Sequence, residues 1–86
     1  MSKRKKFIFK LLIGQSDNNI EFDELCNLLV HFGFIQRIEG SHHIFYKDEI
    51  NEILNIQPKN GKAKNYQVKQ IRDLIIRYSM GEDKDA

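Results

Sequence analysis

Hydrophobic side chains recur every three or four residues in two segments of this 86-residue chain, residues 21–34 and residues 66–80. This spacing predicts two amphipathic helices, each with one apolar face. Gly33 is placed to end the first helix, while Asn65 and Gly81 are placed to cap the second at its start and end. The expected buried positions are Phe22, Leu25, Cys26, Leu29 and Phe32 in the first helix, and Val68, Ile71, Leu74, Ile75 and Tyr78 in the second.

Between these helices the chain is rich in β-branched and aromatic residues, which favour strands. Gly40-Ser41 predicts a tight hairpin turn, and the polar residues 48–51 (DEIN) predict a second turn. Pro58 would end the last strand. The middle of the chain is therefore predicted to be a three-stranded antiparallel meander with strands at residues 34–39, 42–47 and 52–57.

The first twenty residues add a further element. Residues 5–13 are mostly apolar and basic, and they predict a short helix that ends at Gly14, followed by a polar loop, QSDNN. The predicted fold class is α+β, a helix, a three-stranded antiparallel sheet and a helix (α-β-β-β-α) with an extra N-terminal helix. The whole chain, residues 1–86, is expected to be one domain, consisting of an N-terminal extension (1–20), a core (21–80) and a frayed tail (81–86). The sheet face without helices must be covered or be polar.

Composition places the chain among ordinary globular proteins, with 41% hydrophobic and 30% charged residues. The single cysteine, Cys26, permits no internal disulfide and lies in an apolar run, so we expect a buried side chain, with a catalytic thiol as the alternative. The basic and apolar N-terminus resembles a signal peptide, but Lys10 interrupts its apolar run and it has no small-residue cleavage site. We therefore expect a cytoplasmic protein that does not enter a membrane.

Charge is concentrated, although the net charge is only +2. Residues 1–13 carry five positive charges and no negative charge, and residues 57–80 carry six positive charges against Asp73 alone. Two basic blocks indicate a surface that faces a polyanion. The alternative interpretation is that these charges are only solvated.

Two adjacent histidines stand in IEGSHHIFYK (residues 38–47). Side chains on a strand alternate between faces, so His42 and His43 should point in opposite directions, which argues against a metal site built from both. One interpretation is that both are simple strand residues beside water. A functional role for His42 is favoured by its neighbours, because Gly40 lets a phosphate approach the backbone and Ser41 adds a hydroxyl. Histidine, which ordinarily titrates at about pH 6.5, is also well suited to proton transfer.

The order of these elements and two quoted stretches resemble a known family. Residues 28–47, LLVHFGFIQRIEGSHHIFYK, are similar to the central signature of the HicA-type mRNA interferase toxins, and residues 55–75, NIQPKNGKAKNYQVKQIRDLI, are similar to their C-terminal half. The resemblance covers about residues 22–79 and departs from shorter members in the N-terminal extension and the 58–70 loop. It implies a fold like that of double-stranded-RNA-binding domains, RNA cleavage by the histidine directly after Gly-Ser, which is His42, and silencing by a HicB-like antitoxin.

The resulting hypothesis is a toxin of a toxin-antitoxin system that cleaves mRNA without a metal or another cofactor and so inhibits translation. His42 would serve as base or acid for attack by the RNA 2′-hydroxyl, with Tyr46 or Lys64 as weak candidates for a second proton-transfer group and His43 as a structural residue. The alternative is an RNA-binding module of the same fold without catalysis. The residues expected to contact phosphate or RNA are Gly40, Ser41, Lys59, Lys62, Lys64, Lys69 and Arg72. The last helix is expected to expose Lys69, Arg72 and Arg77.

Overall fold

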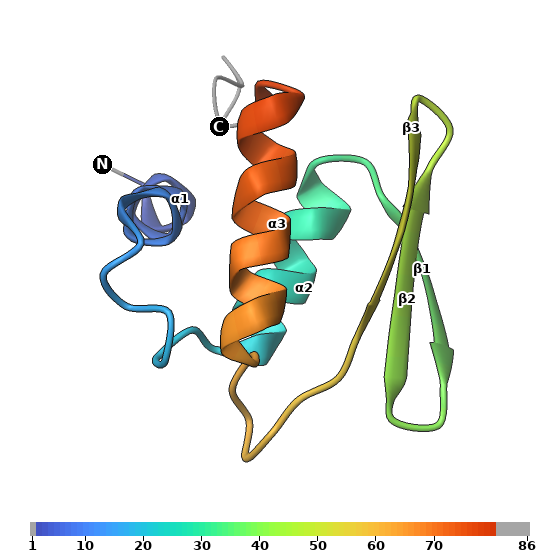
Figure 1. Cartoon of the computed structure of the whole chain (residues 1–86), viewed down its shortest axis with the longest axis horizontal. Helices are drawn as coiled ribbons and strands as arrows, with labels where there is room; N and C mark the ends of the chain where they lie inside the picture. Colours follow the sequence, from blue (N-terminus) through green and yellow to red (C-terminus); the bar gives the residue numbers. More distant parts are fainter. Residues whose placement is uncertain (1, 81–86) are drawn as a thin grey trace.

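The computed structural model describes residues 2–80 and contains the predicted helix–sheet–helix order with one helix before it (Figure 1). The prediction of an α+β fold is thus confirmed. No helix in the described range is long and apolar enough to span a membrane. The elements are α1 (Lys3–Ile13), α2 (Phe22–His31), β1 (Ile35–Glu39), β2 (His42–Lys47), β3 (Ile50–Ile56) and α3 (Asn65–Arg77).

The elements form three layers. The antiparallel sheet has the order β1-β2-β3, and α2 and α3 cover one of its faces (Figure 1). Helix α1 lies against α3 on the side away from the sheet, so the helical layer is covered on both sides. In the part of the chain that the structure describes, no element covers the other face of the sheet, which we call the open face.

The core lies between the sheet and α2 and α3. Phe45 at the centre of β2 is fully buried, as are Leu54 and Ile56 of β3. They share one hydrophobic cluster with the predicted apolar faces of both helices. Burial of apolar surface of this kind is the main favourable term in folding, at about 25 cal/mol for each Å².

Helix α1 belongs to the same core. Its Phe7, Ile8 and Leu11 are buried, and Gly14 ends the helix in the left-handed conformation with φ +77°, as the sequence predicts. The helix begins two residues earlier than expected, because the Ser2 hydroxyl accepts a hydrogen bond from the Lys5 backbone N–H at 3.1 Å and caps its first turn.

Three predicted boundaries are wrong. The second turn contains only residues 48 and 49, because Ile50 is buried and already pairs with Lys47 in the sheet. Asn65 is the first residue of α3 and not its cap, a position that Lys64 occupies. Helix α3 ends at Arg77, so Tyr78 does not continue its buried face and is 40% exposed. The predicted cap Gly81 and the predicted frayed tail lie outside the described residues.

An ion pair joins α3 to the N-terminal segment. The Arg72 guanidinium donates two hydrogen bonds to the Asp17 carboxylate, at 2.8 and 3.1 Å, and a third to the Leu11 carbonyl at 3.3 Å. The hydrogen bond to Asp17 raises the pKa of Arg72. The side chains of Arg72 and Asp17 are only 17% and 13% exposed, so the prediction that Arg72 is exposed is wrong. Arg77 is exposed as expected and donates to Glu52 of β3 at 2.6 Å.

Replacement of Arg72 by alanine should destabilise the protein by about 2–3 kcal/mol, because Asp17 would lose its charged partner in a partly buried site. The matched control is Arg37→Ala, which breaks the exposed pair of Arg37 with Glu39 and should cost less than about 1 kcal/mol. Urea unfolding followed by circular dichroism at pH 7 measures both free energies. Equal losses for the two variants would contradict a structural role for Arg72.

Candidate functional site

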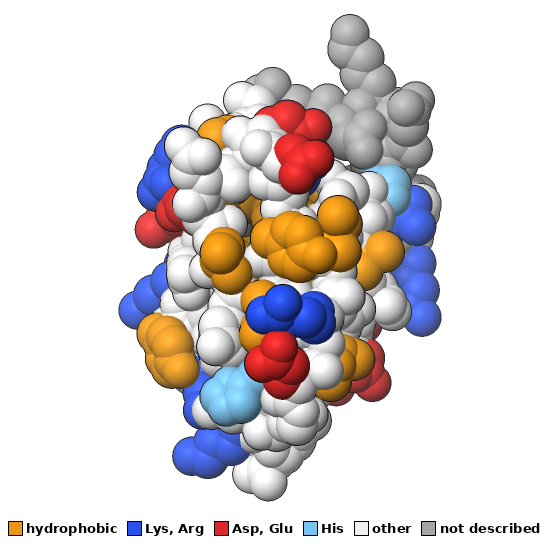
Figure 2. All heavy atoms as spheres, turned by 90° about the vertical axis from the view of Figure 1, so that its right-hand side faces the viewer, with side chains coloured by type: hydrophobic (Ala, Val, Ile, Leu, Met, Phe, Trp, Pro, Cys, Tyr) orange, Lys and Arg blue, Asp and Glu red, His pale blue; other side chains and the backbone are white. Residues whose placement is uncertain are grey.

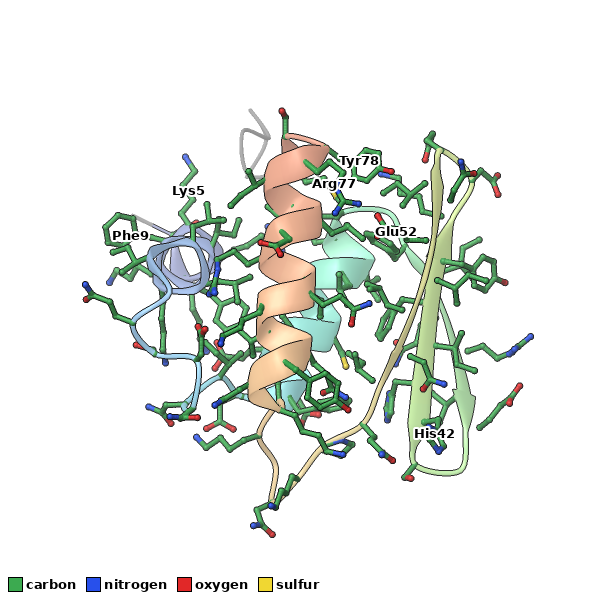
Figure 3. All side chains as sticks on the ribbon, viewed as in Figure 1. Lys5, Phe9, His42, Glu52, Arg77 and Tyr78 are labelled. Carbon is green, nitrogen blue, oxygen red and sulfur yellow. The ribbon has the colours of Figure 1, made fainter. Side chains whose placement is uncertain are left out.

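His42 is the first residue of β2 and lies at the end of the sheet, directly after the Gly40–Ser41 turn (Figure 3). Gly40 adopts φ +62°, a conformation that glycine allows without strain, and this tight turn pairs Glu39 with His42. Phe45 points into the core, so alternation along β2 places His42 on the open face. The His42 side chain is exposed there and accessible to a large ligand.

Asn55 of β3 orients the His42 imidazole. Its Oδ1 lies 3.1 Å from Nδ1 of His42. Because an amide oxygen only accepts, this contact assigns the ring proton of a neutral imidazole to Nδ1 and leaves the lone pair on Nε2. The free nitrogen is the one that can take a proton from a ligand on the open face.

Asn55 was absent from the residues that the sequence predicted for the site. A local signal was present, since Asn55 is the polar residue in the otherwise apolar run ILNI. The sheet register was needed to interpret it, because Asn55 pairs with Ile44, two residues from His42 on the same face.

His43 occupies the opposite face, as predicted. Its Nδ1 lies 3.0 Å from the Gln36 amide nitrogen, and its ring packs edge-on against Phe22 with the centroids 4.9 Å apart. His43 is partly buried between β1 and α2. These contacts give it a packing role in the fold.

A series of hydrogen bonds connects the Gly40–Ser41 turn to α3. The Ser41 hydroxyl donates to the Gln57 side-chain oxygen at 3.3 Å. The Gln57 backbone in turn meets the side-chain amide of Gln67, which is only 1% exposed. With the amide oriented to pair both of its atoms, Gln67 donates to the Gln57 carbonyl and accepts from the Gln57 N–H, each at 3.2 Å. Hydrogen bonds thus connect the turn that precedes His42 to a side chain buried in the core.

The basic loop between β3 and α3 lies at the same end of the molecule as the Gly40–Ser41 turn (Figure 1). A tight turn through Asn60 and Gly61, closed by two backbone hydrogen bonds between Lys59 and Lys62, shapes this loop. It encloses one side of a hollow of about 870 Å³ whose lining includes Lys59, Lys62 and Lys64. The structure therefore brings Gly40, Ser41 and His42 to the same end as the three predicted lysines.

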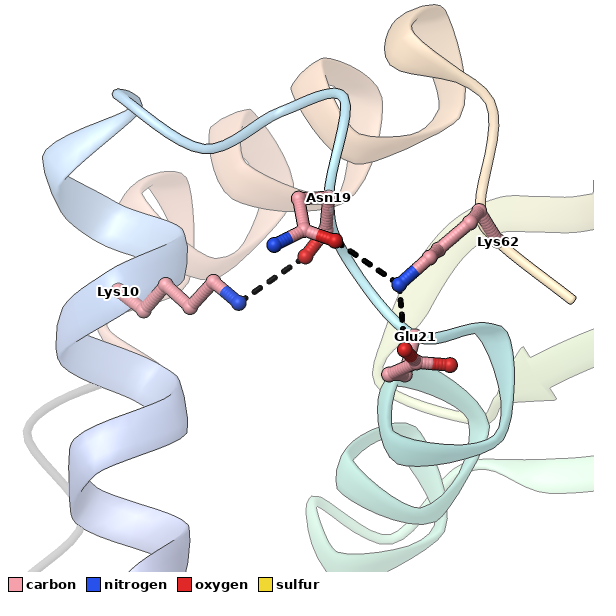
Figure 4. Close-up of polar contacts among 4 residues, drawn as sticks. All are labelled: Lys10, Asn19, Glu21 and Lys62. Carbon is pink, nitrogen blue, oxygen red and sulfur yellow. Dashed lines mark hydrogen bonds and ion pairs between the residues drawn. The ribbon is translucent and has the colours of Figure 1, made fainter.

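Lys62 has structural partners in this loop. Its ammonium group donates to Asn19 Oδ1 at 2.8 Å and forms an ion pair with Glu21 (Figure 4). Lys10 of α1 also reaches Asn19, whose backbone carbonyl accepts its hydrogen bond at 3.0 Å. Lys62 therefore attaches the basic loop to the start of α2, whereas Lys59 is exposed and Lys64 half-buried.

The last two residues that the sequence predicted to contact RNA lie in different parts of the molecule. Lys69 is exposed on α3, but Arg72 is held against Asp17 and Leu11 near α1.

Tyr46 shares the open face with His42 but lies four residues along the strand, roughly 13 Å away at about 3.3 Å for each residue. Such a distance is too long for both to act on one phosphate, so Tyr46 is a poor second proton-transfer group.

Cys26 is buried, as the sequence predicts. Burial raises the pKa of its thiol to about 12, with a smaller contribution from Asp23. The thiol is therefore protonated near neutral pH and unsuited to nucleophilic attack. Across residues 2–80, His, Cys, Asp and Glu side chains form no group of three that could hold a metal ion.

The open face carries an apolar patch. Figure 2 shows hydrophobic side chains across the middle of this face, with charged groups and a histidine around them. The sequence required this face to be covered or polar, and in the described residues it is neither. The patch, which we call the apolar patch, consists of Ile35, Ile44, Tyr46 and Ile53.

Comparison with known proteins gives one family. Residues 22–77 match the model of a family described as "HicA toxin of bacterial toxin-antitoxin". The matched range contains α2, the whole sheet, the basic loop and α3, and it leaves α1 outside. No curated protein and no solved structure gives a significant match to the chain.

Proposed function

Because the chain belongs to the HicA toxin family of bacterial toxin-antitoxin systems, we propose that it is an endoribonuclease that cleaves mRNA with His42 and thereby inhibits translation. The observation that carries this proposal is the Asn55 contact, which leaves Nε2 of an exposed histidine available as a base. The family's toxin role agrees with an activity that arrests growth.

In the proposed reaction, Nε2 of His42 accepts the proton of an RNA 2′-hydroxyl. The 2′-oxygen then attacks the adjacent phosphorus, and the bond from phosphorus to the 5′-oxygen breaks. The leaving 5′-oxygen takes a proton from water. The products are a 2′,3′-cyclic phosphate and a 5′-hydroxyl, and general base catalysis of this kind contributes about 10²–10⁴-fold.

The rim around His42 offers groups for the scissile phosphate. The backbone N–H groups at Gly40 and Ser41 lie next to His42 in a turn that Gln57 supports. Lys59 and Lys64 line the hollow at the same end and can neutralise neighbouring phosphates, whereas Lys62 is already paired with Glu21. Lys69 can extend this contact along α3.

We propose that the antitoxin covers the open face. The patch gives RNA few phosphate partners, because Arg37 beside it already pairs with Glu39 at 2.9 Å. A protein partner would instead gain free energy by burying the apolar patch. Since His42 lies at the end of this face, a partner seated on the patch would also block access to it.

The alternative is an RNA-binding module without catalysis, and His42 separates the two. We expect His42→Ala to lower RNA cleavage by at least about 10²-fold and to abolish growth arrest, while circular dichroism shows an unchanged fold. His43→Ala should retain cleavage but lose about 1–2 kcal/mol of stability, because it removes the contacts with Gln36 and Phe22. A folded His42→Ala protein with full cleavage would leave the binding module as the better interpretation.

The positioning role of Asn55 predicts a pH effect. In Asn55→Asp a carboxylate would face Nδ1 and stabilise the protonated imidazolium, so the base becomes available only at higher pH. The rising limb of the cleavage rate should move up by about one pH unit. Asn55→Leu, which cannot hold the ring, should lower the maximal rate without that displacement. Rates measured from pH 5 to 9 test this, and identical profiles for Asn55→Asp and the unaltered protein would contradict it.

Antitoxin docking is tested at Ile53, which is 68% exposed and contributes little to the core. Ile53→Lys should keep its toxicity but escape neutralisation by the product of the adjacent reading frame, with a loss of affinity of about 30-fold. The control Ile76→Lys changes an equally apolar, exposed residue on α3. Two measurements provide the readouts. The first is growth when each variant is co-expressed with the antitoxin, and the second is the affinity of the antitoxin for each variant in a protein that also carries His42→Ala. Normal neutralisation of Ile53→Lys would place the antitoxin elsewhere.

A further inference from the structure

Four adjacent cations stand in the first turn of α1, namely Lys3, Arg4, Lys5 and Lys6. All four side chains are exposed, and none forms a hydrogen bond or an ion pair with another residue in the range 2–80. Positive charge in a first turn is unfavourable because it faces the positive end of the helix dipole, and no acidic residue offsets it there. The cluster therefore does not serve the stability of α1.

Other basic groups in this part of the molecule are used differently. Lys10 donates to the Asn19 carbonyl, and Arg72 binds Asp17. These residues hold α1 and its loop in place, so the first-turn cations are not needed for that purpose. Their positive field is directed at solvent.

An exposed aromatic ring accompanies these cations. Phe9 is 59% exposed, although Phe7 and Ile8 beside it are buried. Lys5 and Phe9 are one helical turn apart and both point away from α3 (Figure 3). A cation next to an accessible aromatic ring suits single-stranded nucleic acid, because phosphates are neutralised while a base stacks on the ring.

A hollow lies next to the same cations. It measures about 270 Å³ and separates the first half of α1 from α2. Its lining combines two cations with a carboxylate and an amide, which can meet the phosphate and the base edge of a nucleotide, while its two apolar side chains are almost fully buried. The lining residues are Lys3, Arg4, Phe7, Glu24, Asn27 and Leu28.

We propose that the first turn of α1 and Phe9 form a second binding site for single-stranded RNA, distinct from the cleavage site. This inference deepens the proposed function and rests on it for the identity of the ligand. Helix α1 lies on the side of the helical layer opposite the sheet, so RNA held there is remote from the scissile phosphate (Figure 1). The site would tether a long RNA and raise its effective concentration at His42. It lies on the helix that precedes the family-matched range.

An anionic membrane is the competing ligand for a basic helix. A helix that lies in a membrane interface inserts a continuous apolar face. The apolar face of α1, with Phe7, Ile8 and Leu11, is already buried in the protein core. Phe9 and Ile13 are the large apolar side chains that α1 leaves exposed, too few for a continuous apolar face beside the cations, which favours RNA.

The test uses two variants with matched controls, all in the full chain carrying His42→Ala so that RNA stays intact. Arg4→Gln is compared with Arg77→Gln, which removes the same charge from a pair with Glu52. Phe9→Ser is compared with Ile76→Ser, a similarly exposed apolar residue on α3. Affinities for unstructured RNAs of about 30 and 6 nucleotides are measured at several salt concentrations, with circular dichroism melts as a check on folding.

We expect Phe9→Ser to weaken binding of the long RNA by about tenfold, and Arg4→Gln to lower its salt slope by about 0.7, with both controls unchanged. In proteins that retain His42, the KM for the short RNA, which cannot reach both sites at once, should be the same in all variants. In proteins that retain His42, Arg4→Gln should raise KM for the long RNA and leave kcat unchanged.

Other results overturn the inference. These are unchanged binding of the long RNA by both variants, equal losses in the controls, no RNA binding by the parent protein, or Arg4-dependent binding to phosphatidylglycerol vesicles with RNA binding unaffected. Failure of the proposed function is distinguishable, because a protein that retains His42 and binds RNA through α1 without cleaving it would refute the nuclease alone.

Discussion

The burial of Phe45 determines which face of the sheet each side chain of β2 occupies. This residue of the middle strand is fully enclosed beneath α2 and α3, and no smaller or polar side chain could fill the same volume without a large cost. Because a strand alternates its side chains, Phe45 sends His43 toward the helices and sends His42, Ile44 and Tyr46 to the open face. A shift of one residue would exchange the packed histidine with the exposed one. The orientation of the candidate site is thus a consequence of core packing.

The basic residues of this small domain divide into two groups. Lys10, Lys62 and Arg72 bind carboxylates or amide oxygens and connect the N-terminal segment to the basic loop and α3. They give an 86-residue chain with a limited core additional connections between its layers. Lys59 and the first turn of α1 instead remain exposed to solvent. The number of basic residues in a stretch of sequence therefore does not indicate how many of them are accessible to a ligand.

The three layers also separate two kinds of surface. The open face is apolar in its middle and carries His42 at one end, whereas the outer side of α1 is cationic with a single exposed ring. An apolar patch favours a protein partner and a cationic one favours RNA. In the proposed function the toxin meets both ligands, and the two surfaces lie on opposite sides of the helical layer, so long RNA would not compete with the antitoxin at the patch.

Local periodicity in the sequence was sufficient for the order of elements, the opposite directions of His42 and His43, and the ends of α1 and α2 at Gly14 and Gly33. Each of these depends on neighbours within one turn or one strand. Tertiary structure alone decided that Asn55 orients His42, that Lys62 binds Glu21 and that Arg72 binds Asp17, pairs that lie 13, 41 and 55 residues apart. It also decided that Ile50 joins the sheet and that Tyr78 does not join the core. The physical reason is that a charged or amide side chain has many possible partners along the chain, and only packing of the layers brings one of them within hydrogen-bonding distance.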